Sequence, residues 1–528
     1  MMRPSASRSA CATAHLLAGS SVDGNTVATA LPEEPAAGRV ITRGDVSALR
    51  PQGGWSVSPL DPDRALPADP TTRAIAREIY AVTAGLPIVS MHGHVDANLF
   101  VRNDPFPDPA ELFIRPDHYL TRMLGSQGIG RAELGLPEDP TALLPDPRRT
   151  WRLFCENWRL YRATPTRYWL EHILGEVFGT ETRPSAETAD DLYDELAAAL
   201  ARPEFRPIAL LERFRIETLA TTDGAADDLA AHAKLAATDL PALVIPTFRP
   251  DALFAVSGAA WRAGLGRLEA AVGREIGDVA GLLEALRERR QFFVDAGARA
   301  TDHGALAADT TPLDEPSASA IFARALAGEA TAADDAAFTA HMLFEMARMS
   351  TEDGLTMQFH PGALRDYSAD VRARWGADVG YDIPVATEYT RGLRPLLEAF
   401  GHHPGFTFVV FTLDETSFSR ELAPLAGVFP AMRLGAPWWL LDTPGGMRRF
   451  REAVTDNGGF YNTSGFVDDT RAFCSIPARH DLARRVDAGH LAQLVAEGRL
   501  PLDEAAETAV DLAYNLPRET YPALTADA

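Results

Sequence analysis

Residues 86–94 read LPIVSMHGH, a short apolar run that ends in two histidines one residue apart. Its length and β-branched content are typical of a buried strand. Side chains at positions i and i+2 of a strand point to the same face, so His92 and His94 can reach one metal ion. An isolated HxH is more often ordinary polarity at the end of a strand. Its position favours a metal here, because parallel barrels carry their active sites at the carboxyl ends of the strands.

Further runs of this type recur between long Ala-, Leu- and Arg-rich helical patterns. Such alternation predicts parallel βα units, and eight strands close a TIM barrel. We expect strands over residues 86–94, 216–223, 242–248, 297–303, 355–360, 406–414, 432–439 and 460–469. The predicted fold class is therefore α/β, as a (β/α)₈ barrel.

The spacing of these runs predicts the domain organisation. The gap after the first strand is far longer than a usual crossover, and its amphipathic patterns predict a large helical insertion over about 100–215. A second helical insertion is expected over 304–350. Residues 1–60 are rich in Ser, Pro and Gly and are expected to form a poorly ordered leader. A single barrel domain would then span residues 61–528.

The net charge of the 528-residue chain is -23, which excludes two classes of partner. Phosphate backbones and anionic lipid surfaces would be repelled, so we expect no nucleic acid and no membrane partner. An anionic substrate would have to be held by local arginines. The three cysteines show no CxxC spacing, which favours the reducing cytoplasm. The sequence leaves open whether the chain forms a homo-oligomer.

Lys234 is the only lysine in the chain and lies in a helical pattern. Its isolation argues against Schiff-base catalysis, a Walker phosphate-binding loop and a metal pair bridged by a carbamylated lysine. A bias in coding toward arginine explains the scarcity of lysine, and the chemical consequence holds for any cause.

The eighth predicted strand ends in Asp468-Asp469-Thr470-Arg471. Barrel closure would bring this end next to the first strand, where Asp469 could join His92 and His94 as a metal ligand. Two histidines and one carboxylate make a plausible zinc site with room for substrate. The alternative is that the aspartates cap the following helix.

Polar residues at other strand and loop ends are further candidates. His118 and Tyr119 could exchange protons, or could be a satisfied loop pair. Arg249 could grip a carboxylate through two parallel N–H bonds, or could pair with Asp251. His360 could be a metal ligand, a substrate donor or a structural hydrogen-bonding group.

Taken together, these motifs resemble the uronate (glucuronate) isomerase family of the amidohydrolase superfamily. The resemblance starts near residue 60 and extends to the C-terminal region. The matching runs are LPIVSMHGHVD, PDHYLTRMLGSQGI, TLATTDGAADDLAAH, IPTFRPD, TDHG, MQFHPGALRDYS, LGAPWWLLDTPGGM and GFVDDTRAFCSIPARHDLARR. They occur in the order and with the spacing of the family, so together they are far more specific than any one motif.

The resemblance implies an amidohydrolase-type barrel that interconverts D-glucuronate and D-fructuronate, and by extension D-galacturonate and D-tagaturonate. Carried onto this chain, it implies a metal site of His92, His94 and Asp469, with Zn²⁺ or another divalent ion. The main alternative is a metal-dependent hydrolase of the same superfamily, which would act on a sugar-acid lactone or a related ester or amide.

The implied roles and the departures from the family pattern complete the prediction. Asp469 would be the base, and His118 and Tyr119 would move protons. Arg471 would act in catalysis and in substrate binding, with Arg249 and His360 as further substrate contacts. The family's usual TDSR reads DDTR here, its WWFND reads WWLLD, and its HCH reads HGH. The first two changes bear on substrate preference, whereas the third leaves both imidazoles in place.

Overall fold

The computed structural model describes residues 60–139 and 141–523. These residues belong to one compact unit, Val57–Ala528. The leader expected over residues 1–60 lies outside the described residues, apart from Leu60. Among the helices described, none combines the length and the apolar composition that crossing a membrane requires.

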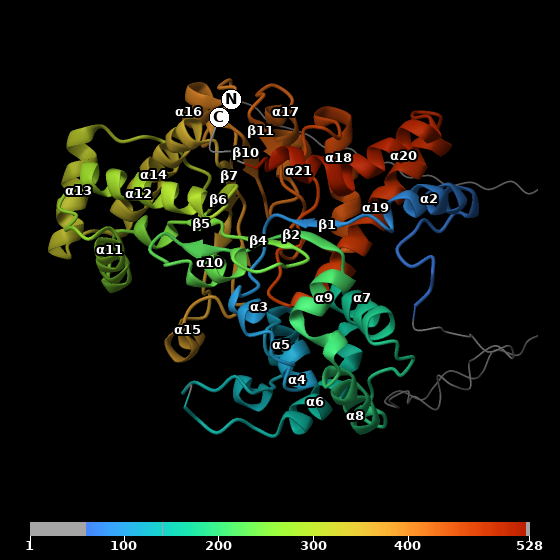
Figure 1. The fold of residues 1–528 in the computed structure, drawn as a ribbon. Helices are drawn as coiled ribbons and strands as arrows, with labels where there is room; N and C mark the ends of the chain where they lie inside the picture. The colour runs from blue at the N-terminus through green and yellow to red at the C-terminus, as the bar shows by residue number, and fades with distance from the viewer. Residues whose placement is uncertain (1–59, 140, 524–528) are drawn as a thin grey trace, which may run out of the picture. The chain divides into compact units, whose positions relative to one another are not determined.

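The main strands form a parallel arrangement in chain order (Figure 1). Strand β3 continues the line of β2, and β5 continues that of β4, so seven barrel positions are occupied by regular strands. The successive pairs are β1 (Ile88–Ser90) with β2 (Ile216–Ala220), β2 with β4 (Leu243–Ile245), β3 (Asp223–Gly224) with β5 (Phe248–Arg249), β5 with β6 (Ala300–Ala305), β6 with β7 (Thr356–Pro361), β7 with β10 (Phe408–Val410), and β10 with β11 (Met432–Leu434).

The eighth position closes the barrel through single backbone contacts instead of a regular ladder. Thr463 forms an isolated parallel bridge with Leu434 of β11. On the other side, the backbone N–H of Asp469 donates to the carbonyl of His92 at 3.2 Å. Gly465 between them has a φ of 76°, which interrupts the extended backbone. The order of the strands confirms the predicted TIM barrel.

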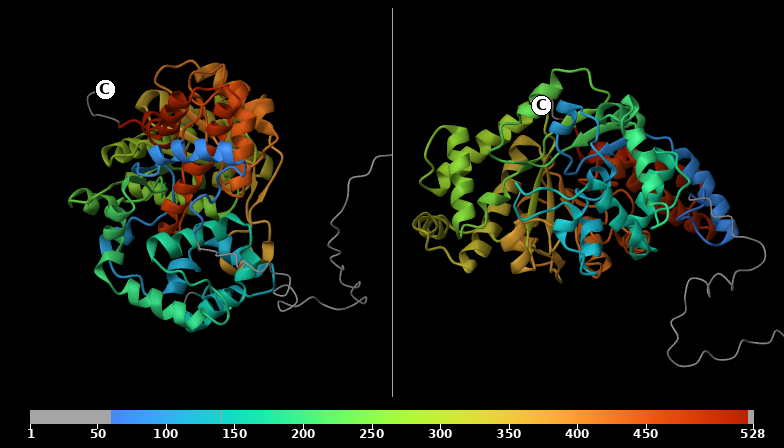
Figure 2. Two further views of the ribbon diagram at one scale, coloured as in Figure 1. Left: turned by 90° about the vertical axis from the view of Figure 1, so that its right-hand side faces the viewer. Right: turned by 90° about the horizontal axis from the view of Figure 1, so that it is seen from below.

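Helices surround the strands and fill the long connections. The barrel helices are α2 (Pro70–Thr83), α10 (Ala230–Ala236), α11 (Ala259–Val272), α12 (Val279–Asp295), α13 (Glu315–Ala327), α14 (Ala332–Asp353), α16 (Arg394–Phe400), α17 (Ala423–Ala426), α18 (Pro444–Gly458), α19 (Ile476–Ala496), α20 (Leu502–Val510) and α21 (Leu516–Thr520). The stretch after β1 contains α3 (Asn98–Arg102), α4 (Pro109–Phe113), α5 (His118–Gly125), α6 (Pro147–Glu156), α7 (Pro165–His172), α8 (Ala189–Leu200) and α9 (Pro207–Arg213). Helices α3 to α9 gather on one side of the strands (Figures 1 and 2).

Several helices begin at the same local signal, an Asp or Thr followed by Pro. The side chain of the first residue accepts a hydrogen bond from a backbone N–H of the first turn, and proline fits the first helical position because it needs no N–H there. The pairs are Asp69-Pro70 in α2, Asp108-Pro109 in α4, Asp146-Pro147 in α6, Thr164-Pro165 in α7 and Thr443-Pro444 in α18. Short-range chemistry therefore sets these helix starts.

A hairpin segment, residues 363–384, leaves the barrel after β7. Its ends pair as the antiparallel strands β8 (Ala363–Leu364) and β9 (Ile383–Pro384), and its middle forms α15 (Ala369–Trp375). The indole N–H of Trp375 donates to the carbonyl of Leu136 at 3.0 Å. The hairpin segment is thereby tied to the insertion that follows β1.

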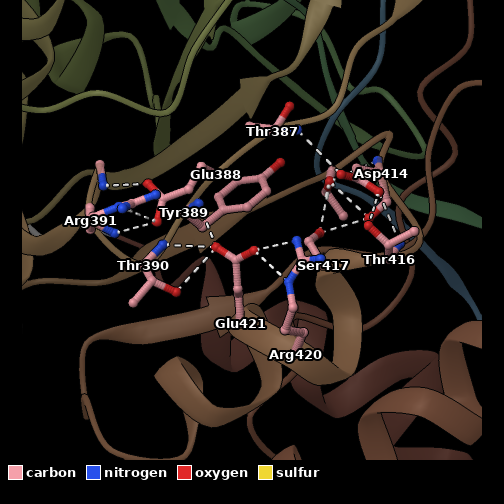
Figure 3. Close-up of polar contacts among 12 residues, drawn as sticks. Thr387, Glu388, Tyr389, Thr390, Arg391, Asp414, Thr416, Ser417, Arg420 and Glu421 are labelled. Atoms are coloured by element: carbon pink, nitrogen blue, oxygen red, sulfur yellow. Dashed lines mark hydrogen bonds and ion pairs between the residues drawn. The ribbon is translucent and has the colours of Figure 1, made fainter. Parts of the chain in front are cut away.

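Glu421 anchors the chain where it returns from the hairpin segment (Figure 3). This residue lies in a π-helical turn, Phe418–Leu422, before α17. Its Oε2 accepts hydrogen bonds from the backbone N–H groups of Tyr389 at 2.7 Å and Thr390 at 2.9 Å. Both Tyr389 and Glu421 are buried. The carboxylate therefore satisfies two donors that no helix or strand pairs.

We expect Glu421→Ala to lower the free energy of unfolding by about 1–3 kcal/mol, because buried N–H groups are left unpaired. Glu421→Gln keeps one acceptor oxygen and should cost less. Glu398→Ala, which removes an exposed pair with Arg394, should stay within about 1 kcal/mol of the parent. Urea unfolding of the three variants is the measurement. If Glu421→Ala and Glu398→Ala lower the free energy of unfolding equally, Glu421 stabilises the fold no more than an exposed ion pair does.

Candidate active site

A cavity of about 260 Å³ lies at the carboxyl ends of the barrel strands. Its wall combines strand ends with the start of α5 and with the hairpin segment. All eight residues predicted for the site line it, namely His92, His94, His118, Tyr119, Arg249, His360, Asp469 and Arg471. The structure thus brings together side chains from positions far apart in the sequence.

Three of them converge on one point. Oδ1 of Asp469 lies 3.3 Å from Nε2 of His92 and 3.1 Å from Nε2 of His94. Burial opposes ionisation of Asp469, but the two imidazoles outweigh it and hold the pKa of this carboxyl well below its usual range. Asp469 has a φ of 42°, in the left-handed region that aspartate tolerates better than most residues. Two nitrogens and one anionic oxygen are a donor set that suits a divalent ion such as zinc.

The preceding residue has a different function. Asp468 is buried, and its Oδ2 lies 3.1 Å from Nε2 of His480 in α19. Helix α19 begins after Ser475, and no side-chain cap bond forms there. The two aspartates therefore do not cap the helix, and of the two it is Asp469 that meets the histidines.

His360 is held by a buried carboxylate. Its Nδ1 lies 2.7 Å from Oδ1 of Asp302, and both residues are almost fully buried. Burial lowers the pKa of His360 to about 4, so the ring is neutral near pH 7 and Nδ1 carries the proton that Asp302 accepts. Nε2 is then an unprotonated acceptor, and it has no hydrogen-bond partner within the described part of the chain. In this arrangement Nε2 of His360 can act as a ligand or as an acceptor.

Arg249 is engaged by two carboxylates. Its Nη1 lies 3.1 Å from Oδ2 of Asp302, and its Nε donates to Oδ2 of Asp251 at 3.0 Å. The ion pair with Asp251 was one of the two interpretations of the sequence. The guanidinium therefore supports Asp302, and within the described residues its Nη2 has no hydrogen-bond partner.

Tyr119 and His118, at the start of α5, line another part of the cavity wall. The Tyr119 hydroxyl donates to Oδ1 of Asp442 at 2.7 Å and accepts from the backbone N–H of Leu440 at 3.0 Å. Burial and the Asp442 charge raise the pKa of Tyr119 well above its usual value, so the hydroxyl keeps its proton. Burial, together with the charge of Arg471, lowers the pKa of His118 to about 4.

Arg471 is joined to the hairpin segment. Its Nη2 donates to the carboxylate of Asp378, and its Nη1 donates to the carbonyl of the same residue at 3.3 Å. The side chain remains partly exposed and lines the cavity. The end of the eighth strand and the hairpin segment therefore enclose the cavity together.

Several further residues in and behind the cavity wall were not among the predicted site residues. Asp302 lies in β6, within the strand expected over residues 297–303, and its polar side chain near the end of that run was the available signal. Arg479 and Asp442 form a buried pair at 2.7 Å behind Tyr119, and the guanidinium of Arg479 lies 3.7 Å from the centre of the Trp169 ring. Arg365 of the hairpin segment was visible only as part of the MQFHPGALRDYS motif. Their partners are distant in sequence, so spacing alone could not reveal them.

Comparison with known proteins gives a consistent result. A family model described as glucuronate isomerase matches residues 71–521. A uronate isomerase of Rhizobium meliloti (strain 1021) is 51% identical over 463 residues, which cover 88% of this chain and 99% of that protein. One of Phenylobacterium zucineum (strain HLK1) is 51% identical over 462 residues, covering 88% of this chain and 96% of that one.

Solved structures agree with these matches. The glucuronate isomerase of Caulobacter crescentus has a TM-score of 0.86 and 47% identity, covering 88% of this chain and 96% of that chain. The uronate isomerase of Thermotoga maritima has a TM-score of 0.82 and 28% identity, covering 88% and 99%. These matches confirm the resemblance found in the sequence, and the chain belongs to the glucuronate isomerase family.

Proposed function

We propose that the chain is a uronate isomerase that converts D-glucuronate to D-fructuronate, with D-galacturonate and D-tagaturonate as a second pair. The observation that carries the proposal is the ionised Asp469 facing two imidazoles in a cavity that also presents arginines. We also propose a cytoplasmic location, since Cys155 and Cys474 are both free thiols.

His92, His94 and Asp469 would hold a divalent cation, for which zinc suits the donors best. When bound, the cation polarises an oxygen of the substrate as a Lewis acid. His360 offers its unprotonated Nε2 on the same side of the cavity, where its ring stacks on that of His92 at 4.5 Å. We assign it to a substrate hydroxyl or to the cation as a further contact.

The reaction moves one proton between neighbouring carbons. In the open-chain aldose, the Asp469 carboxylate takes the proton from C2, the C2–H electron pair forms a C1=C2 bond, and the C1 oxygen becomes negative. Asp469 then returns its proton to C1, while the C2 hydroxyl loses its proton and becomes the ketone. General base catalysis of this kind needs an ionised carboxylate near neutral pH, which matches the lowered pKa of Asp469.

The remaining residues handle the oxygens. Neutral His118 can accept a proton and return it, so we assign proton movement between the C1 and C2 oxygens to His118. Tyr119 keeps its proton and donates it to Asp442, so its hydroxyl would join this movement by turning from Asp442 toward the substrate. Arg471 and Arg249 supply positive charge that steadies the enediolate. Because both arginines are paired with aspartates, their positions are fixed before substrate enters.

Incubation with D-glucuronate in D₂O should yield a keto sugar that carries carbon-bound deuterium, detected by NMR. Asp469→Asn should reduce turnover by at least about 100-fold, because the amide cannot accept the C2 proton. Asp96→Asn, an exposed change near the first strand, should keep parent activity. Release of acid from sugar lactones with no keto sugar from uronates would instead indicate the hydrolase.

Asp302→Asn tests the support of His360. Oδ1 of Asp302 accepts a hydrogen bond from His360, and Oδ2 forms an ion pair with Arg249. Asparagine has one oxygen and no charge, so the variant must turn an N–H group toward either His360 or Arg249. We expect a 10- to 100-fold loss of activity or of metal affinity, as is usual for residues that orient ligands. Titration of bound zinc and kcat should be measured beside Asp295→Asn, an exposed control. Parent values in Asp302→Asn would exclude the orienting role.

A further inference from the structure

Asp469 has a left-handed backbone, and contacts on both sides of it hold that conformation. Its φ is 42°, which a residue other than glycine keeps only where the surrounding structure determines the backbone. Two contacts come from the first strand. The N–H of Asp469 donates to the carbonyl of His92, and the carbonyl of Thr470 accepts from the N–H of His94. Neither bond involves Asp468, the residue that precedes Asp469.

Helix α19 supplies the contacts to Asp468. Arg479 donates from Nη1 to the backbone carbonyl of Asp468 at 3.3 Å, and Nε2 of His480 lies 3.1 Å from Oδ2 of the Asp468 side chain. Burial lowers the pKa of His480, so the ring is neutral near pH 7 and Nε2 carries the proton that the carboxylate accepts. Two consecutive residues of α19 therefore hold the main chain and the side chain of Asp468.

Asp468 and His480 lie behind the cavity wall. Among the described residues that line the cavity, neither is present, whereas Asp469 is. Oδ1 of Asp468 lies 3.7 Å from the position that a Cβ on Gly93 would occupy, and Gly93 separates the two histidines of the first strand. This oxygen has no hydrogen-bond partner within the described part of the chain. The orientation of the Asp468 carboxylate therefore depends on its bond with His480.

Helix α19 is itself fixed on either side of His480. Arg479 forms a buried pair with Asp442 at 2.7 Å. Asp481 is also buried, and it accepts hydrogen bonds from the Tyr168 hydroxyl at 2.9 Å and from Arg64 at 3.0 Å. A helix that is held at both neighbours of His480 provides a fixed support for the turn that carries Asp469.

Stability alone does not account for this buried pair. Burying a carboxylate with one unpaired oxygen carries a desolvation penalty, and two apolar side chains of similar size are often as stable. The hydrogen bond provides direction, which apolar side chains do not, because it fixes the Asp468 side chain relative to α19. Asp468 is joined to Asp469 by one peptide bond, so this direction bears on the backbone of Asp469.

We propose that His480 is a positioning residue, which acts through Asp468 to hold the Asp469 carboxylate over His92 and His94. The proposal rests on the proposed function, in which Asp469 is a ligand and the base, and it adds a residue outside the cavity. Without the bond from His480, the turn should relax toward ordinary φ values and move the Asp469 carboxylate away from the imidazoles. Metal binding and proton transfer should then weaken together, since both depend on that carboxylate.

Zinc affinity tests the proposal independently of turnover. The dissociation constant of the full-length protein for Zn²⁺ should be measured by competition with a chromophoric chelator, for the parent, His480→Leu and His480→Gln. We expect His480→Leu to raise this constant, and to lower kcat for D-glucuronate, by about 10- to 100-fold, as is usual when a residue that orients a ligand is lost. Glutamine can place an N–H near the position of Nε2, so His480→Gln should recover most of both losses.

His490→Leu is the matched control. His490 lies in the same helix, and its Nε2 lies 3.1 Å from the hydroxyl of Thr455, away from the cavity. Its zinc affinity and kcat should match those of the parent.

A double variant separates positioning from folding. His480→Leu/Asp468→Leu leaves no buried carboxylate unpaired, so its urea unfolding midpoint should return toward that of the parent. Its zinc affinity and kcat should stay low, which a purely structural role of the pair would not produce.

The outcomes distinguish this proposal from the proposed function. If the parent forms no keto sugar from D-glucuronate, the proposed function is wrong, and the zinc constants still test the role of His480. Zinc affinity equal to that of the parent in His480→Leu, or in the double variant, would overturn the positioning role. Equal losses in His480→Leu and His490→Leu would also overturn it, because a general change in α19 would then explain both.

Discussion

The contact between the first and the last strand of the barrel is the constraint on which the site depends. Backbone hydrogen bonds join His92 to Asp469 and His94 to Thr470, and the same contact places the Asp469 carboxylate over both imidazoles. The left-handed backbone conformation of Asp469 costs about 1–3 kcal/mol of folding free energy. Such a conformation persists only where the surrounding structure determines it. The three side chains therefore converge only when the barrel closes.

Binding an anion to so acidic a protein depends on donor geometry more than on net potential. With a net charge of -23, the chain repels anions at long range. Within the cavity each arginine has its own aspartate partner, so local charge is also largely compensated. Binding of an anion must then depend on the orientation of the N–H groups. A guanidinium that is held on one side by a carboxylate presents its other N–H groups in a fixed orientation. Paired aspartates thus prepare the arginines for binding and also limit which of them can bind.

The sequence predicted the features that depend on short spacing and on the rules of the barrel. The i, i+2 spacing of His92 and His94 and the C-terminal-face rule were enough to place both in the cavity. Resemblance to a family added the roles of Tyr119 and Arg471. The partner of His360, Asp302, lies 58 positions away, and the partner of Tyr119, Asp442, lies 323 positions away. No local pattern encodes such contacts, because they depend on how separate strands and helices meet. The eighth strand was expected to be regular, but Gly465 reduces it to a single bridge.

The proposed proton-transfer groups and the hairpin segment lie on different parts of the fold. The groups that we assign to C1, C2 and the cation come from strand ends and from α5, which are packed into the barrel. Arg365 comes from the hairpin segment, whose return is fixed by Glu421 and whose middle rests on the insertion after β1. Changes in the hairpin segment would therefore alter a wall of the cavity that is separate from the strand end carrying Asp469. Such a division allows one barrel to retain its proton-transfer site while the loops around it adapt to different substrates.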